Sequence, residues 1–219
     1  MPYSRIKFVS LQDIYTHGIV RYKKGKRMEE FKKILAEEAE YKLSAETMDK
    51  FCACMEEIHL KRYDYMIKSG DIDTNIYVVK EGIIRRTHEV GDKIMTNSFA
   101  IKGSVLISWH CYYFNQPSYS QFQACCDTVL MRVSKEKFDE LIATSHEFAR
   151  WALSLAHGTL YYQEFKSRII KGDVKERYMS LIKNRPEIIQ KVPLGFIASY
   201  LGITQSHLSR MRNELAKEK

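Results

Sequence analysis

The sequence has few cysteines, few prolines and no long apolar runs, and each shortage excludes a class of protein. Its 219 residues include four prolines and ten glycines, which excludes collagen-like repeats and low-complexity chains. Five cysteines are too few, and odd in number, for a disulfide scaffold, so a reducing cytoplasmic location is expected. No stretch approaches the roughly 18 apolar residues of a membrane span. The hydrophobic share of 45% is nevertheless enough for a buried core.

Positive charge is concentrated at both ends of the chain, whose net charge is +8. Residues 1–27 carry seven basic side chains and one acid, and residues 171–219 carry ten basic and five acidic side chains. Basic ends indicate a polyanion partner, and a surface charged for solubility is the alternative. Residues 1–27 are expected to form a basic extension. Met28 is a candidate natural start, because a helical pattern opens there.

Short β-branched or aromatic segments dominate the middle of the chain. Ser44 is a suitable cap for a helix over residues 45–57. Turn signals rich in glycine and aspartate then separate six candidate strands. These strands are residues 58–68, 76–80, 83–90, 93–101, 118–126 and 129–133. The spacing predicts an antiparallel β-roll, and helical patterns follow it. The expected fold class is therefore α+β, with N-terminal helices, a β-roll, a long helix and a C-terminal helical domain.

The C-terminal segment, residues 194–215, has the pattern of a helix-turn-helix. One helix spans residues 194–201, and Gly202 can end it because glycine adopts the left-handed conformation with little strain. Thr204 is a suitable N-cap for a second helix from Gln205. Ala198 is small enough for the two helices to cross closely. Their apolar residues form one set, Ile197, Leu201, Ile203, Leu208, Met211 and Leu215. The second helix of such a pair enters the DNA major groove, and a hairpin that only packs is the alternative.

The exposed face predicted for the second helix is polar and carries no acid before Glu214. Arg210 can pair with O6 and N7 of guanine, and Gln205 can pair with adenine. Thr204, His207 and Arg212 are expected to contact phosphates and to fix the register. The predicted DNA-binding residues are Thr204, Gln205, Ser206, His207, Ser209, Arg210, Arg212 and Asn213.

A stripe of apolar or small residues runs along the long helix that is predicted from about residue 144 to about residue 170. The alternating steps of three and four are typical of a two-helix seam, and Gly158 would let two backbones approach closely. Packing on the chain's own roll is the alternative. Thr144 and Glu147 have the spacing of a capping box. The predicted dimer-interface residues are Phe148, Trp151, Leu155, Gly158, Tyr162 and Phe165, and Ile169 continues the stripe.

This order of elements resembles the Crp/Fnr superfamily of bacterial transcription regulators, which carry a cyclic-nucleotide-binding-like sensor domain. Residues 65–71 resemble that family's strand and Gly-Asp turn, and residues 76–82 its next strand, which ends in glycine. Residues 134–142 resemble the family's short helix after the roll. Arg177, Pro186 and residues 197–210 resemble its DNA-binding domain. The resemblance implies a cytoplasmic homodimer that binds double-stranded DNA, contacts RNA polymerase and has no enzymatic activity.

The ligand site departs from the family pattern. Cyclic-nucleotide binders use a Gly-Glu pair and an Arg-Ser or Arg-Thr pair, and the arginine neutralises the phosphate. Counted from Gly103, these pairs fall on Ile107-Ser108 and Ser118-Tyr119, so both charged residues are missing. A buried cyclic phosphate would lack its counter-charge, so tight binding of cyclic AMP is not expected. The effector is unknown, and no cofactor is implied.

An aromatic stretch, residues 109–122, is expected either to line a pocket for an apolar ligand or, as favoured, to fill the roll in place of a nucleotide. Arg85 and Arg86 are neighbours on a strand and face opposite sides, so one of them can face the pocket, and the favoured alternative is that both are surface charges. The candidate pocket residues are Arg85, Ile107, Ser108, Trp109, Ser118 and Tyr119.

The resemblance divides the chain into four segments and leaves two alternative functions. The segments are a basic extension (1–27), a sensor domain (28–143), a long helix with its hinge (144–171) and a helix-turn-helix domain (172–219). The family's base-reading positions fall on Gln205, Ser206 and Arg210, and only Arg210 keeps the residue type of the cyclic-AMP-responsive members, so a different operator is expected. The sequence ends at Lys219, so the β-hairpin wing of many members is not expected.

One alternative is a ligand-independent DNA-binding protein with a structural roll. The other is a cupin-like metal enzyme, for which His88 and His110 lack the paired His-x-His spacing. The cysteine spacing also argues against an iron–sulfur cluster, so no metal is expected.

Overall fold

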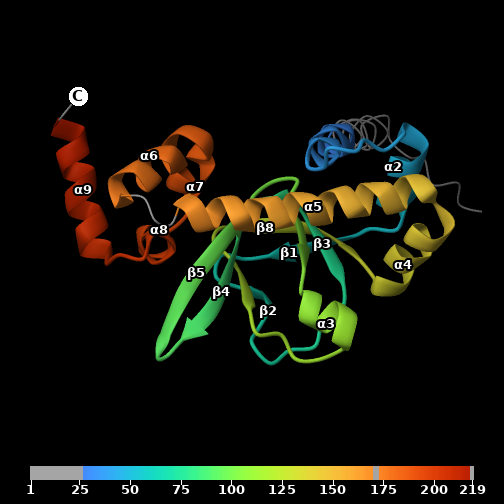
Figure 1. Ribbon diagram of the computed structural model, residues 1–219, viewed down its shortest axis with the longest axis horizontal. Helices are drawn as coiled ribbons and strands as arrows, with labels where there is room; N and C mark the ends of the chain where they lie inside the picture. Colours follow the sequence, from blue (N-terminus) through green and yellow to red (C-terminus); the bar gives the residue numbers. More distant parts are fainter. Residues whose placement is uncertain (1–26, 170–172, 218–219) are drawn as a thin grey trace, which may run out of the picture.

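The computed structural model describes residues 27–169 and 173–217 (Figure 1). It confirms the α+β order of N-terminal helices, two antiparallel sheets, one long helix and a C-terminal group of helices. The predicted basic extension lies outside the described residues, except for Arg27. Within the described ranges, no helix is long and apolar enough to cross a membrane.

Two helical segments precede the first strand and pack on one side of the roll. Residues 27–37 are helical, and α2 (Ala45–Ala53) follows. The Ser44 side chain caps α2 as predicted, because its Oγ accepts a hydrogen bond from the Thr47 backbone N–H at 3.3 Å. The predicted extension of this helix to residue 57 is wrong, because the chain from Glu56 onward pairs as a strand with residues 128–132.

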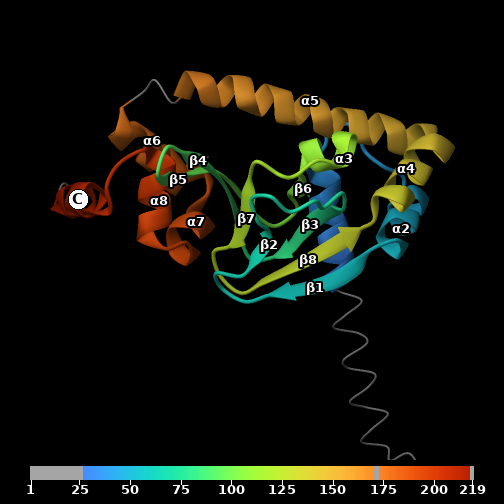
Figure 2. The same ribbon diagram turned by 90° about the horizontal axis from the view of Figure 1, so that it is seen from below.

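In the described chain, eight strands form two four-stranded antiparallel sheets that face each other (Figure 2). One sheet has the order β1-β8-β3-β6 and the other β2-β7-β4-β5. The strands are β1 (Glu56–Leu60), β2 (Tyr65–Ile67), β3 (Ile76–Glu81), β4 (Ile84–Val90), β5 (Lys93–Ala100), β6 (Val105–Ile107), β7 (Gln121–Ala124) and β8 (Thr128–Val133). This arrangement is the predicted β-roll.

Four of the six predicted strands are confirmed, as β3, β4, β5 and β8. The first predicted strand is divided into β1 and β2 by a turn in which Tyr63 has a φ of 75°. The fifth is shortened to β7. The strand β6 and the helix α3 (Trp109–Phe114) were not predicted, because elements of three and six residues are too short to show a period.

The space between the two sheets is filled by apolar side chains. Ile67, Val79, Ile84, Phe122 and Leu130 each have an exposed fraction of 1% or less and form one cluster. The turn between β3 and β4 requires glycine. Gly82 has a φ of 94°, and a Cβ at this position would lie 2.7 Å from the Cα atom of Thr128. The roll is therefore closely packed and tightly connected at this end.

The helix α4 (Lys135–Thr144) leads into α5 (His146–Ile169), which runs along the outside of the roll (Figure 2). Ser145 caps α5, because its Oγ accepts a hydrogen bond from the Phe148 backbone N–H at 3.2 Å. The predicted capping box of Thr144 and Glu147 is wrong.

Glu147 instead links α5 to α2. Its carboxylate accepts hydrogen bonds from the hydroxyl of Thr47 and from the backbone N–H and hydroxyl of Ser44. These donors, Thr47 first, lower the pKa of Glu147. The start of α5 is therefore fixed to the N-terminal part of the roll domain.

The C-terminal helices are α6 (Val174–Asn184), α7 (Pro186–Lys191), α8 (Leu194–Leu201) and α9 (Gln205–Lys217). They lie together at one end of the molecule, beyond the C-terminal half of α5 (Figure 1). Pro186 begins α7, where its missing N–H breaks no helical hydrogen bond. Pro193 is the N-cap of α8.

Candidate nucleic-acid interface

The helices α8 and α9 form a helix-turn-helix with the predicted boundaries. In the turn, Gly202 has a φ of 72°, and the Ile203 backbone N–H donates to the Ala198 carbonyl at 3.0 Å. The predicted N-cap of α9 is confirmed, because Thr204 Oγ1 accepts a hydrogen bond from the His207 backbone N–H at 3.2 Å. The turn chemistry of the sequence therefore sets the angle between the two helices.

The predicted apolar set forms the core of this unit. Ala198 is only 2% exposed at the crossing of the two helices. Arg177 on α6 donates from Nη2 to the Leu201 carbonyl at 3.0 Å, which holds the C-terminus of α8 against α6. The buried members of the set are Ile197, Leu201, Leu208 and Met211, and Ile203 and Leu215 are partly buried beside them. The whole apolar side of α9 therefore packs inward.

The opposite side of α9 is exposed and polar. All eight predicted DNA-binding residues, from Thr204 to Asn213, are exposed. Gln205 lies against α8 in this structure, since a Cβ at Gly195 would be 2.9 Å from Gln205 Oε1. Its amide has to turn outward to reach a base. This face carries no acid before Glu214, so it is electrostatically suited to a phosphate backbone.

The candidate pocket residues of the roll do not gather in one place. Ser108 and Ser118 are buried, with their hydroxyl oxygens 3.1 Å apart, and Ile107 is half-buried in β6. Trp109 and Tyr119 are 37% and 73% exposed. The expectation that these two aromatic residues line or fill the roll is therefore wrong. The short helix α3 turns only one face inward, with Cys111 and Tyr112.

The two adjacent arginines of β4 face opposite sides, as the alternation of a strand predicts. Arg86 shares the inner side with Phe122 and donates from Nε to Ser120 Oγ at 3.0 Å. Arg85 lies on the outer side, where its guanidinium covers the ring of Phe196 on α8. Burial lowers the pKa of both guanidinium groups. The structure thus places Arg85 away from the buried serines and against the helix-turn-helix.

The N-terminal half of the predicted dimer stripe of α5 is turned toward the chain's own roll. Phe148 and Trp151 are fully buried. Both rings pack edge-on against Phe51, and they are tilted against each other. Neither can contact a partner, so their assignment to the dimer interface is wrong. Leu155 is half-buried beside the same cluster, and Gly158 is exposed. The side chains of Tyr162 and Phe165 lie outside the described residues.

A second apolar row on α5 faces solvent. Leu153 and Leu160 are 56% and 67% exposed, and the half-buried Ala149 and Ala156 alternate with them. The steps of four, three and four are those of a two-helix seam. The same signal is present in the sequence, but the bulkier aromatic stripe beside it is the stronger pattern.

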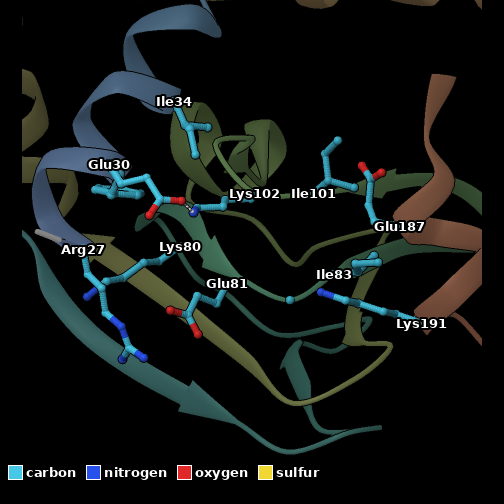
Figure 3. Close-up of a pocket in the computed structure, with 12 residues that line it drawn as sticks. Arg27, Glu30, Ile34, Lys80, Glu81, Ile83, Ile101, Lys102, Glu187 and Lys191 are labelled. Atoms are coloured by element: carbon cyan, nitrogen blue, oxygen red, sulfur yellow. Dashed lines mark hydrogen bonds and ion pairs between the residues drawn. The ribbon is translucent and has the colours of Figure 1, made fainter. Parts of the chain in front are cut away.

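A cavity of about 500 Å³ lies between residues 27–34, the β3–β4 turn and α7 (Figure 3). Its wall mixes charges of both signs. Lys80 is paired with Glu57, and Lys102 with Glu30 at 2.6 Å. Among residues 27–169 and 173–217, no group of three or more His, Cys, Asp or Glu side chains is placed to hold a metal ion. The cavity therefore offers no metal centre, and its lining of four basic and three acidic side chains has nearly balanced charge.

The roll is similar to a described protein family. Residues 57–145 match the family model of the cyclic nucleotide-binding domain. No curated protein matches the sequence.

Solved structures share the fold over most of the chain. FixK2 from Bradyrhizobium japonicum matches with a TM-score of 0.64 and 18% identity, over 75% of this chain and 85% of its own. The c-di-GMP-responsive global regulator CLP of Xanthomonas campestris has a TM-score of 0.62 and 17% identity, over 80% of this chain and 93% of its own. The catabolite activator protein of Thermus thermophilus has a TM-score of 0.51 and 16% identity, over 80% and 85%. At such identities, the likeness shows the fold.

Proposed function

We propose that this protein, which has the fold of the Crp/Fnr regulators, is a homodimeric and sequence-specific DNA-binding transcription regulator without enzymatic activity. The observation that carries the proposal is the helix-turn-helix, whose second helix presents an exposed, polar and initially acid-free face. The proposed division is a sensor domain over residues 28–143, a long helix and hinge over 144–171, and a DNA-binding domain over 172–219. Double-stranded DNA, RNA polymerase and a second copy of the chain are the proposed partners.

Each exposed residue of α9 has a proposed role. Arg210 and Gln205 would read base edges in the major groove, with Ser206, Ser209 and Asn213 beside them. Thr204, His207 and Arg212 would contact phosphates and fix the register of the helix. A dimer would place two such helices in successive major grooves, about 34 Å apart along the duplex.

The experiment that tests the function is selection of bound DNA from a random pool at a stated salt concentration, with and without metabolite extract. The proposal expects an enriched palindrome with two half-sites. Failure to enrich any duplex, at low ionic strength as well, would refute it. If the protein binds an enriched palindrome with the same affinity in the presence and absence of extract, the ligand-independent alternative is favoured.

The outward row of α5 predicts where the two copies meet. Leu160→Glu should convert the dimer to a monomer, because it places a charge in the middle of an apolar seam. Sedimentation equilibrium measures the change. Thr159→Glu, the same charge one position off the row, is the matched control and should stay dimeric. A dimeric Leu160→Glu variant would mean that the copies associate elsewhere.

The roll predicts weak or absent binding of cyclic AMP. The stretch from Ser108 to Ser118, where the family's charged pairs would stand, contains no acid and no arginine, and its two buried serines bond to each other. Isothermal titration should therefore show no affinity in the micromolar range, with linear AMP as the control ligand. A dissociation constant of micromolar or tighter would contradict this expectation.

A further inference from the structure

The helix-turn-helix is attached to the outer face of the roll as well as to the end of α5. The helix α8 lies beside β4 and β5 (Figure 2), and the Thr96 backbone N–H donates to Ser199 Oγ at 2.9 Å. The rings of Phe99 and Tyr200 pack with centroids 5.2 Å apart. One apolar cluster joins Ile83, Phe99 and Cys125 of the roll to Ile188, Ile197 and Leu201 of the helices. The position of α8 is therefore set by the roll.

Two arginines lie at this junction: Arg185 donates from Nη1 to the Phe99 carbonyl at 3.3 Å, and Arg85 is the more deeply placed one, on the roll itself. It is 9% exposed, and its guanidinium carbon lies 3.3 Å from the ring centroid of Phe196 on α8. Nε and Nη2 both donate to Gln123 Oε1, at 2.9 and 2.6 Å. In the described part of the chain, no carboxylate pairs with it. The ring of Phe196 therefore replaces the counter-ion that a buried guanidinium ordinarily has.

The partners of Arg85 are themselves held in place. Gln123 Nε2 donates to the Tyr63 carbonyl at 2.9 Å, which turns the amide oxygen of Gln123 toward Arg85. The Tyr63 ring packs edge-on against Phe196, with centroids 6.0 Å apart. Arg85 and Phe196 thus meet in a fixed arrangement that is built from β4, β7 and the turn after β1.

This docked arrangement is compatible with DNA binding. While α8 contacts the roll, the whole polar face of α9 stays exposed, and α9 lies at the far end of the molecule (Figure 1). The docking therefore does not cover the DNA-binding face. It fixes the direction in which that face points, and holding a binding surface in its bound position lowers the entropy lost on binding.

We propose that Arg85 and Phe196 are positioning residues for DNA binding: their contact docks α8 on the roll and so fixes the separation of the two recognition helices in the dimer. This inference rests on the proposed function. It also gives the roll a direct route to the DNA-binding helices that does not pass through α5.

The test compares full-length variants on three operators, the selected palindrome and versions with the half-site spacing changed by plus or minus one base pair. Each change displaces a half-site by about 3.4 Å. Phe196→Leu and Arg85→Gln should weaken binding to the palindrome about tenfold, but weaken binding to the altered operators much less. The preference for one spacing should therefore shrink. Phe196→Tyr keeps the ring, so this variant should have the same spacing preference as the parent protein.

The matched control is Arg86→Gln, the same substitution one residue along β4 on the opposite face. It should leave the spacing preference unchanged. If Phe196→Leu and Arg85→Gln weaken all three operators equally, tighten binding, or behave as Arg86→Gln does, the positioning role is overturned.

A second measurement separates this inference from the proposed function, because it needs no DNA. In hydrogen exchange followed by mass spectrometry, Phe196→Leu and Arg85→Gln should speed exchange in residues 94–99 and 194–200. Exchange in β3 and β8 should not change. Unchanged exchange at the junction would refute the docking contact even in a protein that binds DNA. Faster exchange in a protein that binds no DNA would refute the function and leave the contact standing.

Discussion

Trp151→Ala is expected to lower the free energy of unfolding by about 3–5 kcal/mol, because it removes the largest fully buried side chain of the core. The indole packs with the rings of Phe51 and Phe148, at centroid distances of 5.2 and 5.3 Å. Its Nε1 has no hydrogen-bond partner in the described chain. The loss is therefore one of packing alone.

Urea unfolding at one fixed protein concentration measures this effect. His157→Ala, on the exposed side of the same helix, is the control and should change the unfolding free energy by less than about 0.5 kcal/mol. Repeating both substitutions in the Leu160→Glu background removes any contribution from dimerisation. If the Trp151→Ala protein is as stable as the parent but monomeric, Trp151 is a residue of the dimer interface and not of the core.

Arg210→Ala is expected to weaken binding to the selected operator by about 1–3 kcal/mol per recognition helix, and to relax the preference at one base position. Arg210 is exposed at the middle of α9, and among the described residues no acid pairs with its side chain. Its guanidinium is therefore available for the two acceptors of a guanine, and alanine supplies neither donor.

The measurement is fluorescence anisotropy on the operator and on versions with each base substituted in turn, at several salt concentrations. Arg212→Ala is the matched control, because a phosphate contact should weaken binding to all sequences alike and reduce the salt slope by about one per recognition helix. If Arg210→Ala weakens binding to all sequences alike and reduces the salt slope, Arg210 contacts the DNA backbone and another residue of α9 reads the base.

Local signals account for the parts that the sequence predicted well. The helix-turn-helix is short, and Gly202, Thr204 and Ala198 each fix the backbone or the crossing within a few residues. The boundaries of α8 and α9 could therefore be predicted without knowledge of the rest of the chain. The capping of α2 by Ser44 is equally local.

Non-local packing accounts for the errors. A helix with two apolar rows does not reveal which row faces its own domain, and α5 turns the aromatic row inward because Phe51 and the roll core are there to receive it. Trp109 and Tyr119 look like core residues by composition. Trp109 is exposed because α3 is too short to bury more than one face against the roll, and Tyr119 is exposed in the connection between α3 and β7.

The sequence by itself determined the order of elements, the helix-turn-helix and the polar face of α9, because these depend on contacts between residues close along the chain. It also determined that Arg85 and Arg86 face opposite sides of one strand. Only the tertiary structure decided which arginine meets α8, since Gln123, Tyr63 and Phe196 come from three distant segments. The buried Arg85 is tolerated because these segments supply a ring and an amide oxygen, and no pattern local in the sequence predicts that contact.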